Sequence, residues 1–164
     1  MSTPTPAHSR TVTVSVPATS ANLGPGFDCL GLALELRNEV TVTAGGPLLP
    51  YDDPRPTDYA VAVSGIDADK VPADSRNLLV QAADTLFQRA GRRPAALTVN
   101  ADNQIPVGSG LGSSSAAIIA GLLAANAVSE AGWTQRRLLR LAVAMEGHPD
   151  NVAAAMFGGF TVAA

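Results

Sequence analysis

The stretch that decides the fold is PVGSGLGSSSA, Pro106 to Ala116, in which alternating glycines and three serines lead into an apolar run ending at Val128. Glycine permits tight turns and brings backbone N–H groups close to a ligand. The apolar run has the length and composition of a buried helix. A helix N-terminus collects unpaired N–H groups and the positive end of the dipole, so it attracts anions. The stretch therefore predicts a phosphate-binding loop, with Ser113 to Ser115 supplying an N-cap and hydroxyls for phosphate or metal.

The spacing differs from the two common nucleotide-binding loops. A P-loop needs a lysine before its final Ser or Thr, but Ser113 follows the last glycine and Lys70 is the only lysine in the chain. In G-x-G-x-x-G, the third glycine would come one residue after Gly112. The alternative interpretation is a turn of Gly and Ser that only caps a core helix.

Composition limits the class of protein. The 164 residues are 46% apolar and 15% charged, which is typical of one globular domain with a substantial core. A net charge of −3 and scattered basic residues argue against nucleic-acid binding. Cys29 is the single cysteine, which fits a reducing compartment. The N-terminus lacks a signal-peptide core, and run 116–128 is too short to span a bilayer. We expect a cytoplasmic protein that does not bind membranes.

The order of elements predicts an α+β layered domain. Residues 1–10 read as a disordered tail and residues 11–164 as one domain. Alternation and apolar content predict strands at 11–16, 29–36, 39–43, 59–66, 95–100 and 160–163. Loops are expected at 18–28, after Pro17, and at 45–58, with a turn at Arg37–Asn38. Helical spacing predicts helices at 75–90, at 116–128, after an N-cap at Thr134, and from Pro149 to Gly158.

Two further polar stretches accompany the glycine-rich loop. Asn22 to Asp28 is rich in turn-forming residues, and an ordinary turn is one interpretation of it. Glu146 to Asn151 reads EGHPDN and places a carboxylate at a predicted helix C-terminus, against the dipole. A metal ligand would account for that placement, whereas the alternative is a solvated turn capped by Asp150 or Asn151.

Three motifs together resemble those of a known family. VPATSANLGPGFDCLGLAL (16–34), IPVGSGLGSSSAA (105–117) and EGHPDNVAAAMFGG (146–159) are similar to successive motifs of the GHMP kinases. Within that superfamily, the first and third motifs most resemble those of the homoserine kinases of threonine biosynthesis. The resemblance implies a ribosomal protein S5 domain 2-like N-terminal domain, with an antiparallel or mixed sheet, helices and a left-handed βαβ unit. Family members are longer, so we expect a truncated N-terminal part without the C-terminal domain.

The resemblance also implies the site and its ligands, ATP and Mg²⁺. Mg²⁺ would be held by Ser114 and Glu146, with Glu146 and Asn151 as catalytic residues. Homoserine would be bound by Asn22, Asp28, His148 and Asn151. ATP would contact the residues of the glycine-rich loop and an asparagine near the adenine: Pro106, Val107, Gly108, Ser109, Gly110, Leu111, Gly112, Ser113, Ser114, Ser115, Ala116 and Asn77.

The mechanism and the exact activity stay open at this point. An amide such as Asn151 orients a hydroxyl without deprotonating it, so either Asp150 or no residue acts as the general base. Phosphorylation of L-homoserine is the leading hypothesis. A GHMP kinase of the mevalonate or diphosphocytidyl-methylerythritol type and a non-catalytic S5-like binding module are the alternatives. A homodimer of the full-length protein is left open.

Overall fold

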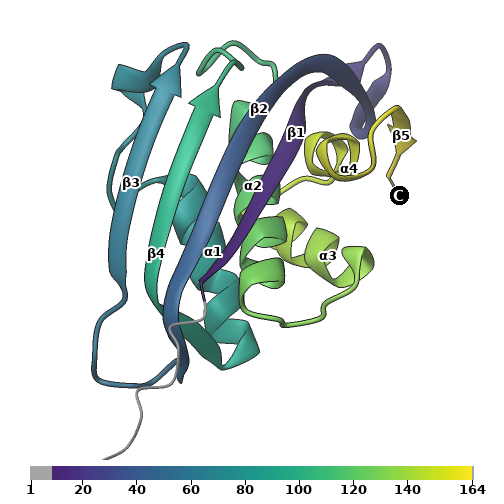
Figure 1. The fold of residues 1–164 in the computed structure, drawn as a ribbon. Coiled ribbons are helices and arrows are strands. Elements are labelled where there is room, and N and C mark those ends of the chain that lie inside the picture. The colour runs from purple at the N-terminus through teal and green to yellow at the C-terminus, as the bar shows by residue number, and fades with distance from the viewer. Residues whose placement is uncertain (1–8, 164) are drawn as a thin grey trace, which may run out of the picture.

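The computed structural model describes residues 9–163, which form a mixed sheet with helices on one face (Figure 1). The strands are β1 (Arg10–Leu23), β2 (Gly26–Pro50), β3 (Asp58–Gly65), β4 (Arg92–Asn103) and β5 (Phe160–Val162). The helices are α1 (Leu78–Ala90), α2 (Ser113–Val128), α3 (Gln135–Glu146) and α4 (Asp150–Phe157), with a 3-10 turn at Ala68–Lys70. The expected α+β class is confirmed.

The sheet order is β1-β2-β4-β3, and β5 pairs with β2. The pairs formed by β2 are antiparallel, whereas β3 and β4 are parallel. In Figure 1, α1 lies behind the sheet, and β4 lies to the right of β3 with both strands pointing up. This β3-α1-β4 crossover is therefore left-handed, as the family resemblance implies, although such connections are almost always right-handed.

The core is built around α2. This helix packs against α1, α3, α4 and the inner face of β1 and β2, so nearly all of its length is buried. A Cβ at Gly121 would overlap the backbone carbonyl of Leu79, which shows how closely α1 approaches α2. The outer face of the sheet is exposed and carries cross-strand threonine pairs, such as Thr13 with Thr41. The layered arrangement leaves the N-terminus of α2 at one end of the sheet (Figure 1).

The first two strands are longer than the sequence predicts. Pro17 does not end β1, because a register shift between Pro17 and Thr19 lets the pairing with β2 continue. No turn occurs at Arg37–Asn38, and β2 runs through both residues. Arg37 donates hydrogen bonds to the side chain and carbonyl of Ser15, which holds it within the sheet. Local turn-forming residues were thus overridden by long-range pairing.

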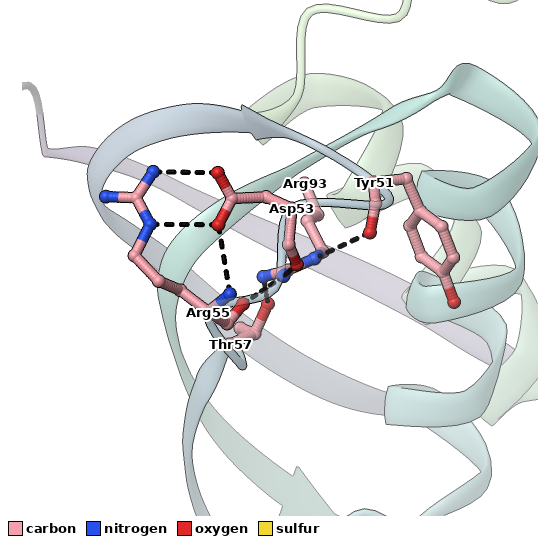
Figure 2. Close-up of polar contacts among 5 residues, drawn as sticks. All are labelled: Tyr51, Asp53, Arg55, Thr57 and Arg93. Atoms are coloured by element: carbon pink, nitrogen blue, oxygen red, sulfur yellow. Dashed lines mark hydrogen bonds and ion pairs between the residues drawn. The ribbon is translucent and has the colours of Figure 1, made fainter.

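Strand β2 also takes up the first part of the loop predicted at 45–58. A register shift between Gly45 and Leu48 accommodates the glycines and Pro47, and pairing with β4 continues to Pro50. The remaining loop, 51–57, is fastened to β4 by Arg93, which is only 6% exposed. Figure 2 shows its guanidinium reaching several groups of this loop, namely the carbonyls of Tyr51, Asp53 and Arg55 and the hydroxyl of Thr57.

The observed helix boundaries agree closely with those predicted from the sequence, with one exception at the N-cap of α2. Thr134 caps α3 by accepting from the Arg137 N–H, and α4 begins directly after Pro149. The N-cap of α2, however, is Gly112 and not a serine, because all three serines lie in the first helical turn.

Most of the predicted N-terminal tail, residues 1–8, lies outside the described residues, and Arg10 already belongs to β1. Within residues 9–163, no helix is long and apolar enough to cross a membrane.

Candidate functional site

The glycine-rich loop connects β4 to the N-terminus of α2. Gly108, Gly110 and Gly112 have φ angles of 73°, 77° and 69°, a left-handed conformation that strongly favours glycine. No atom lies within 4 Å of where a Cβ would stand at Gly108 or Gly110. The loop thus leaves open space beside its backbone, and the first turn of α2 directs unpaired N–H groups to the same place.

Four hydrogen bonds hold the loop and the residues just before it in position. The Val107 N–H donates to Asp67 Oδ2 at 3.0 Å, and the Thr19 N–H donates to the Leu111 carbonyl at 3.0 Å. Upstream of the loop, Asn38 Oδ1 accepts from the Gln104 and Ile105 N–H groups. The hydrogen bond from Lys70 and the one from Val107 lower the pKa of Asp67, so this carboxylate stays charged at neutral pH. These contacts fasten the loop to the rest of the domain at its ends, while in its middle Ser109 Oγ donates to the Pro106 carbonyl within the loop itself.

A cleft of about 470 Å³ lies beside the loop. It brings together predicted residues that are far apart in the sequence: most of the glycine-rich loop, Ser114, Glu146, Asn151 and Asn77. Its wall also includes Lys70, Val71, Pro72, Arg76, Leu78 and Ala117. The cleft therefore combines an anion-attracting loop, a carboxylate and an apolar wall.

Glu146 and two serines form one hydrogen-bonded group at the edge of the cleft. Ser114 Oγ donates to Glu146 Oε1 at 2.6 Å, and the buried Ser115 Oγ donates to the same oxygen at 3.0 Å. Glu146 is the last residue of α3, where its charge opposes the helix dipole. The two hydroxyls stabilise the carboxylate there and leave its Oε2 without a hydrogen bond from any residue in 9–163.

The other residues of the third motif separate into two environments. Asn151 lines the cleft and accepts a hydrogen bond from the Thr19 hydroxyl at 2.7 Å. Asp150 is fully buried, with Oδ1 accepting from the Asn151 N–H and contacting His148 Nδ1 at 3.2 Å. Asp150 Oδ2 has no partner within residues 9–163. His148 is exposed and does not line the cleft.

The first motif also contributes no predicted substrate residue to the cleft. Asn22 and Asp28 are exposed at the β1–β2 turn, where Asn22 Oδ1 accepts from the Asp28 N–H at 3.0 Å. Both have positive φ angles, of 56° and 55°. The turn lies at the same end of the sheet as the glycine-rich loop (Figure 1), but the structure does not bring these side chains into the cleft lining.

Asn77 has a structural task besides its place in the cleft wall. It is the N-cap of α1, accepting from the Leu79 N–H at 3.0 Å and donating to the Pro72 carbonyl at 2.8 Å. Lys70 and Arg76 in the cleft, and Thr19 behind it, were not predicted as site residues from the sequence. Only Lys70 carried a signal, as the single lysine of the chain.

The comparisons with known proteins agree with this geometry. A family model described as the GHMP kinases N terminal domain matches residues 77–159, half of the chain. The chain belongs to the GHMP kinase family. The matched residues of this GHMP kinase domain run from the N-cap of α1 to the end of α4 and include the whole glycine-rich loop.

Individual relatives support the same assignment. A homoserine kinase from Symbiobacterium thermophilum is 49% identical over 156 residues, which cover 92% of this chain and 45% of that protein. The crystal structure of a homoserine kinase from Cytophaga hutchinsonii superposes with a TM-score of 0.75 at 28% identity, covering 93% of this chain and 48% of that one. A mevalonate kinase from Methanococcus jannaschii shares the fold, with a TM-score of 0.64 at 12% identity, covering 92% of this chain and 52% of that one. This GHMP kinase chain spans about half the length of the relatives it matches.

Proposed function

We propose that this chain carries the nucleotide-binding half of a homoserine kinase, which transfers the γ-phosphoryl group of ATP to the hydroxyl of L-homoserine. The observation that carries the proposal is the meeting of the glycine-rich loop, the α2 N-terminus and the Ser114–Glu146 pair at one cleft. A homoserine kinase that is 49% identical in sequence favours homoserine as the substrate, and among the superposed structures identity is likewise higher to a homoserine kinase, at 28%, than to a mevalonate kinase, at 12%. The product would serve threonine biosynthesis.

The loop would bind the phosphates of ATP through its backbone. The N–H groups around Gly108 and Gly110 and those of the first turn of α2 offer several donors to anionic oxygens. The apolar wall at Pro72 and Leu78, next to Asn77, offers a surface for the adenine ring. Phosphoryl transfer depends mainly on such positioning and on charge neutralisation, so this arrangement suits the reaction.

Ser114 and Glu146 fit a magnesium site completed by phosphate and water. Mg²⁺ often binds through one or two carboxylates plus substrate phosphates, and it does not need a cage made of protein ligands only. Within residues 9–163, no group of three or more His, Cys, Asp or Glu could hold a metal ion, which is compatible with this sparse ligand set. Bound there, Mg²⁺ would neutralise phosphate charge next to the α2 N-terminus.

Homoserine would approach from the side of Asn151. We assign its ammonium group to Asp28, with Asn22 and His148 as further contacts, on the resemblance of their motifs. Asp150 is fully buried while Asn151 lines the cleft, which favours a reaction without a protein base. The hydroxyl proton would pass to a phosphate oxygen or to water.

The nucleotide part of the proposal is tested by titrating the protein with a non-hydrolysable ATP analogue, with and without Mg²⁺. We expect Mg²⁺ to strengthen binding, and Glu146→Gln to remove most of this effect because an amide is a poor ligand for a hard cation. Glu39→Gln, on the exposed outer face of the sheet, is the matched control and should bind as the parent does. Absence of analogue binding by the folded parent would favour a non-catalytic binding module.

The substrate part is tested by ADP release from the full-length protein supplied with ATP. Homoserine should stimulate ADP release and mevalonate should not. In the same assay, Asp28→Asn should raise KM for homoserine and leave KM for ATP nearly unchanged, because it removes only the charge that pairs with the substrate ammonium. Stimulation by mevalonate alone would assign the protein to the other branch of the family.

A further inference from the structure

We infer that Thr19 is a positioning residue that determines which end of the Asn151 amide faces the nucleotide cleft, an inference that rests on the proposed function. Thr19 is completely buried in β1 and contacts two separate parts of the site. Its N–H binds the Leu111 carbonyl in the glycine-rich loop, and its hydroxyl donates to Asn151 Oδ1 in α4 at 2.7 Å. One threonine therefore connects the phosphate loop to the residue opposite it.

The direction of the second hydrogen bond fixes what Asn151 offers to a ligand. An amide side chain has an acceptor oxygen and a donor NH₂ group. The oxygen is taken by Thr19, while the NH₂ group has no hydrogen bond to any described residue. That nitrogen is not fully buried. Because Asn151 lines the cleft and its oxygen is taken by Thr19, the group that it can offer to a ligand there is a pair of N–H donors.

A donor at this place acts differently from an acceptor. The NH₂ group can bind a γ-phosphate oxygen or a lone pair of the substrate hydroxyl, and so hold the two reacting groups together. A carbonyl oxygen at the same place would repel the phosphate and would bind the hydroxyl proton that has to leave. Asn151 itself transfers no proton, in agreement with a reaction that has no protein base.

The structure reserves the space for the Thr19 hydroxyl. A Cβ at Gly112 would overlap Thr19 Oγ1 and come within 3.3 Å of Asn151 Oδ1. The glycine that caps α2 therefore also leaves room for the hydrogen bond between Thr19 and Asn151. A flipped amide could still donate to Thr19 Oγ1, but the proton of this buried hydroxyl would then have no acceptor among the described residues. Without the hydroxyl this cost disappears, and the amide can rotate by half a turn.

The activity test compares Thr19→Val, which removes the hydroxyl, with Thr19→Ser, which keeps it. In the full-length protein we expect Thr19→Val to lower kcat with homoserine about tenfold, with little change in KM for ATP, and Thr19→Ser to restore most of kcat. Thr41→Val, which removes an exposed hydroxyl on the outer face, is the matched control. The double variant Thr19→Val/Asn151→Ala should be no slower than Asn151→Ala, because Thr19 acts through Asn151. Additive losses in kcat would overturn the inference.

A spectroscopic test is independent of the substrate. In ¹⁵N-labelled protein, the side-chain NH₂ signals of Asn151 are assigned by their loss in Asn151→Ala. We expect Thr19→Val to shift or split these signals, reporting a second amide orientation, and Thr19→Ser to leave them near the parent positions. Unchanged signals in folded Thr19→Val would overturn the inference even if the enzyme phosphorylates homoserine. If Thr19→Val shifted the Asn151 signals as expected but homoserine did not stimulate ADP release by the parent protein, the result would count against the proposed substrate alone.

Discussion

Two loops of this molecule are rich in residues that disfavour regular structure, yet they are held in opposite ways. Loop 51–57 surrounds the buried guanidinium of Arg93, which occupies three of its backbone carbonyls and a hydroxyl (Figure 2). The glycine-rich loop is fastened to other elements near its ends, at Val107 and Leu111, and it borders a cleft. A loop whose polar groups are satisfied within the protein is structural, whereas one with free donors beside open space can bind a ligand.

The exposed ion pair on loop 51–57 contributes little to holding this loop in its conformation. Asp53 and Arg55 form a two-pronged ion pair in Figure 2, and it lowers the pKa of the Asp53 carboxyl. Exposed pairs of this kind contribute little to stability because water screens them. The buried Arg93 is therefore the residue on which the conformation of the loop depends.

The largest effect that we predict comes from Arg93→Met, which removes the contacts of the structural loop. The carbonyl groups of loop 51–57 lose the charged guanidinium that donates to them, so we expect the free energy of unfolding to fall by about 3 kcal/mol. Binding of the ATP analogue by the remaining folded protein should be unchanged, because the loop lies outside the cleft lining. Urea unfolding and analogue titration measure the two quantities.

Arg93→Lys is the control for charge in this experiment. A lysine keeps the positive charge but cannot reach several carbonyls in a plane, so it should recover only part of the stability. Full recovery by Arg93→Lys would show that charge, and not the planar set of hydrogen bonds, holds loop 51–57.

An intermediate effect is predicted for the glycines of the other loop. At Gly112, an alanine Cβ would overlap the buried Thr19 side chain, so Gly112→Ala should cost about 2 kcal/mol of stability and abolish analogue binding. At Gly110 the space is open and only the positive φ opposes a Cβ, so Gly110→Ala should cost about 1 kcal/mol. Its affinity for the analogue should still fall, since the Cβ occupies the ligand side.

Comparison of the two glycine variants separates the need for space beside Thr19, which affects stability, from the need for open space on the ligand side, which affects analogue binding. Thermal unfolding ranks their stability, and calorimetric titration ranks their affinity. If Gly110→Ala bound the analogue as tightly as the parent, the open space beside the loop would not be the phosphate site.

The smallest effect concerns the contact between Asp67 and the Val107 N–H. The pKa of Asp67 is lowered from 3.8 in the folded protein, chiefly by the hydrogen bond with Lys70. Its contribution to stability is therefore fully present above pH 3.8 and is lost as the pH falls through the lowered folded pKa. We expect Asp67→Asn to have a slightly lower melting temperature than the parent at neutral pH, and the difference to disappear in acid. Asp69→Asn, which lacks the contact with Val107, should show no such pH-dependent difference.

Local signals in the sequence predicted the parts of the structure that depend on nearby residues. The glycines and the apolar run after them predicted the loop and α2, and Thr134 and Pro149 marked the starts of α3 and α4. Glu146 was singled out because its charge opposes a helix dipole, and it does lie at the cleft.

The remainder depends on partners that are distant in the sequence. Pro17 and the Arg37–Asn38 pair carry local signals for an end and a turn, but antiparallel pairing over many residues overrides both. Thr19 gave no signal, because its importance comes from Asn151, which lies 132 positions further along the chain. A cleft assembled from separate elements cannot be read from spacing within any one of them.

The burial of α2 has a consequence for the motions of the site. The helix whose first turn faces the cleft is surrounded by the sheet and the other helices, so it cannot detach while the core stays packed. The hydrogen-bonded amides of α2 beyond its first turn should therefore exchange with solvent only when the whole domain unfolds, while the unpaired amides of the first turn and of the glycine-rich loop exchange through local opening. A ligand that binds to both would slow exchange in the loop and the first turn directly, and in the rest of α2 only by stabilising the whole domain.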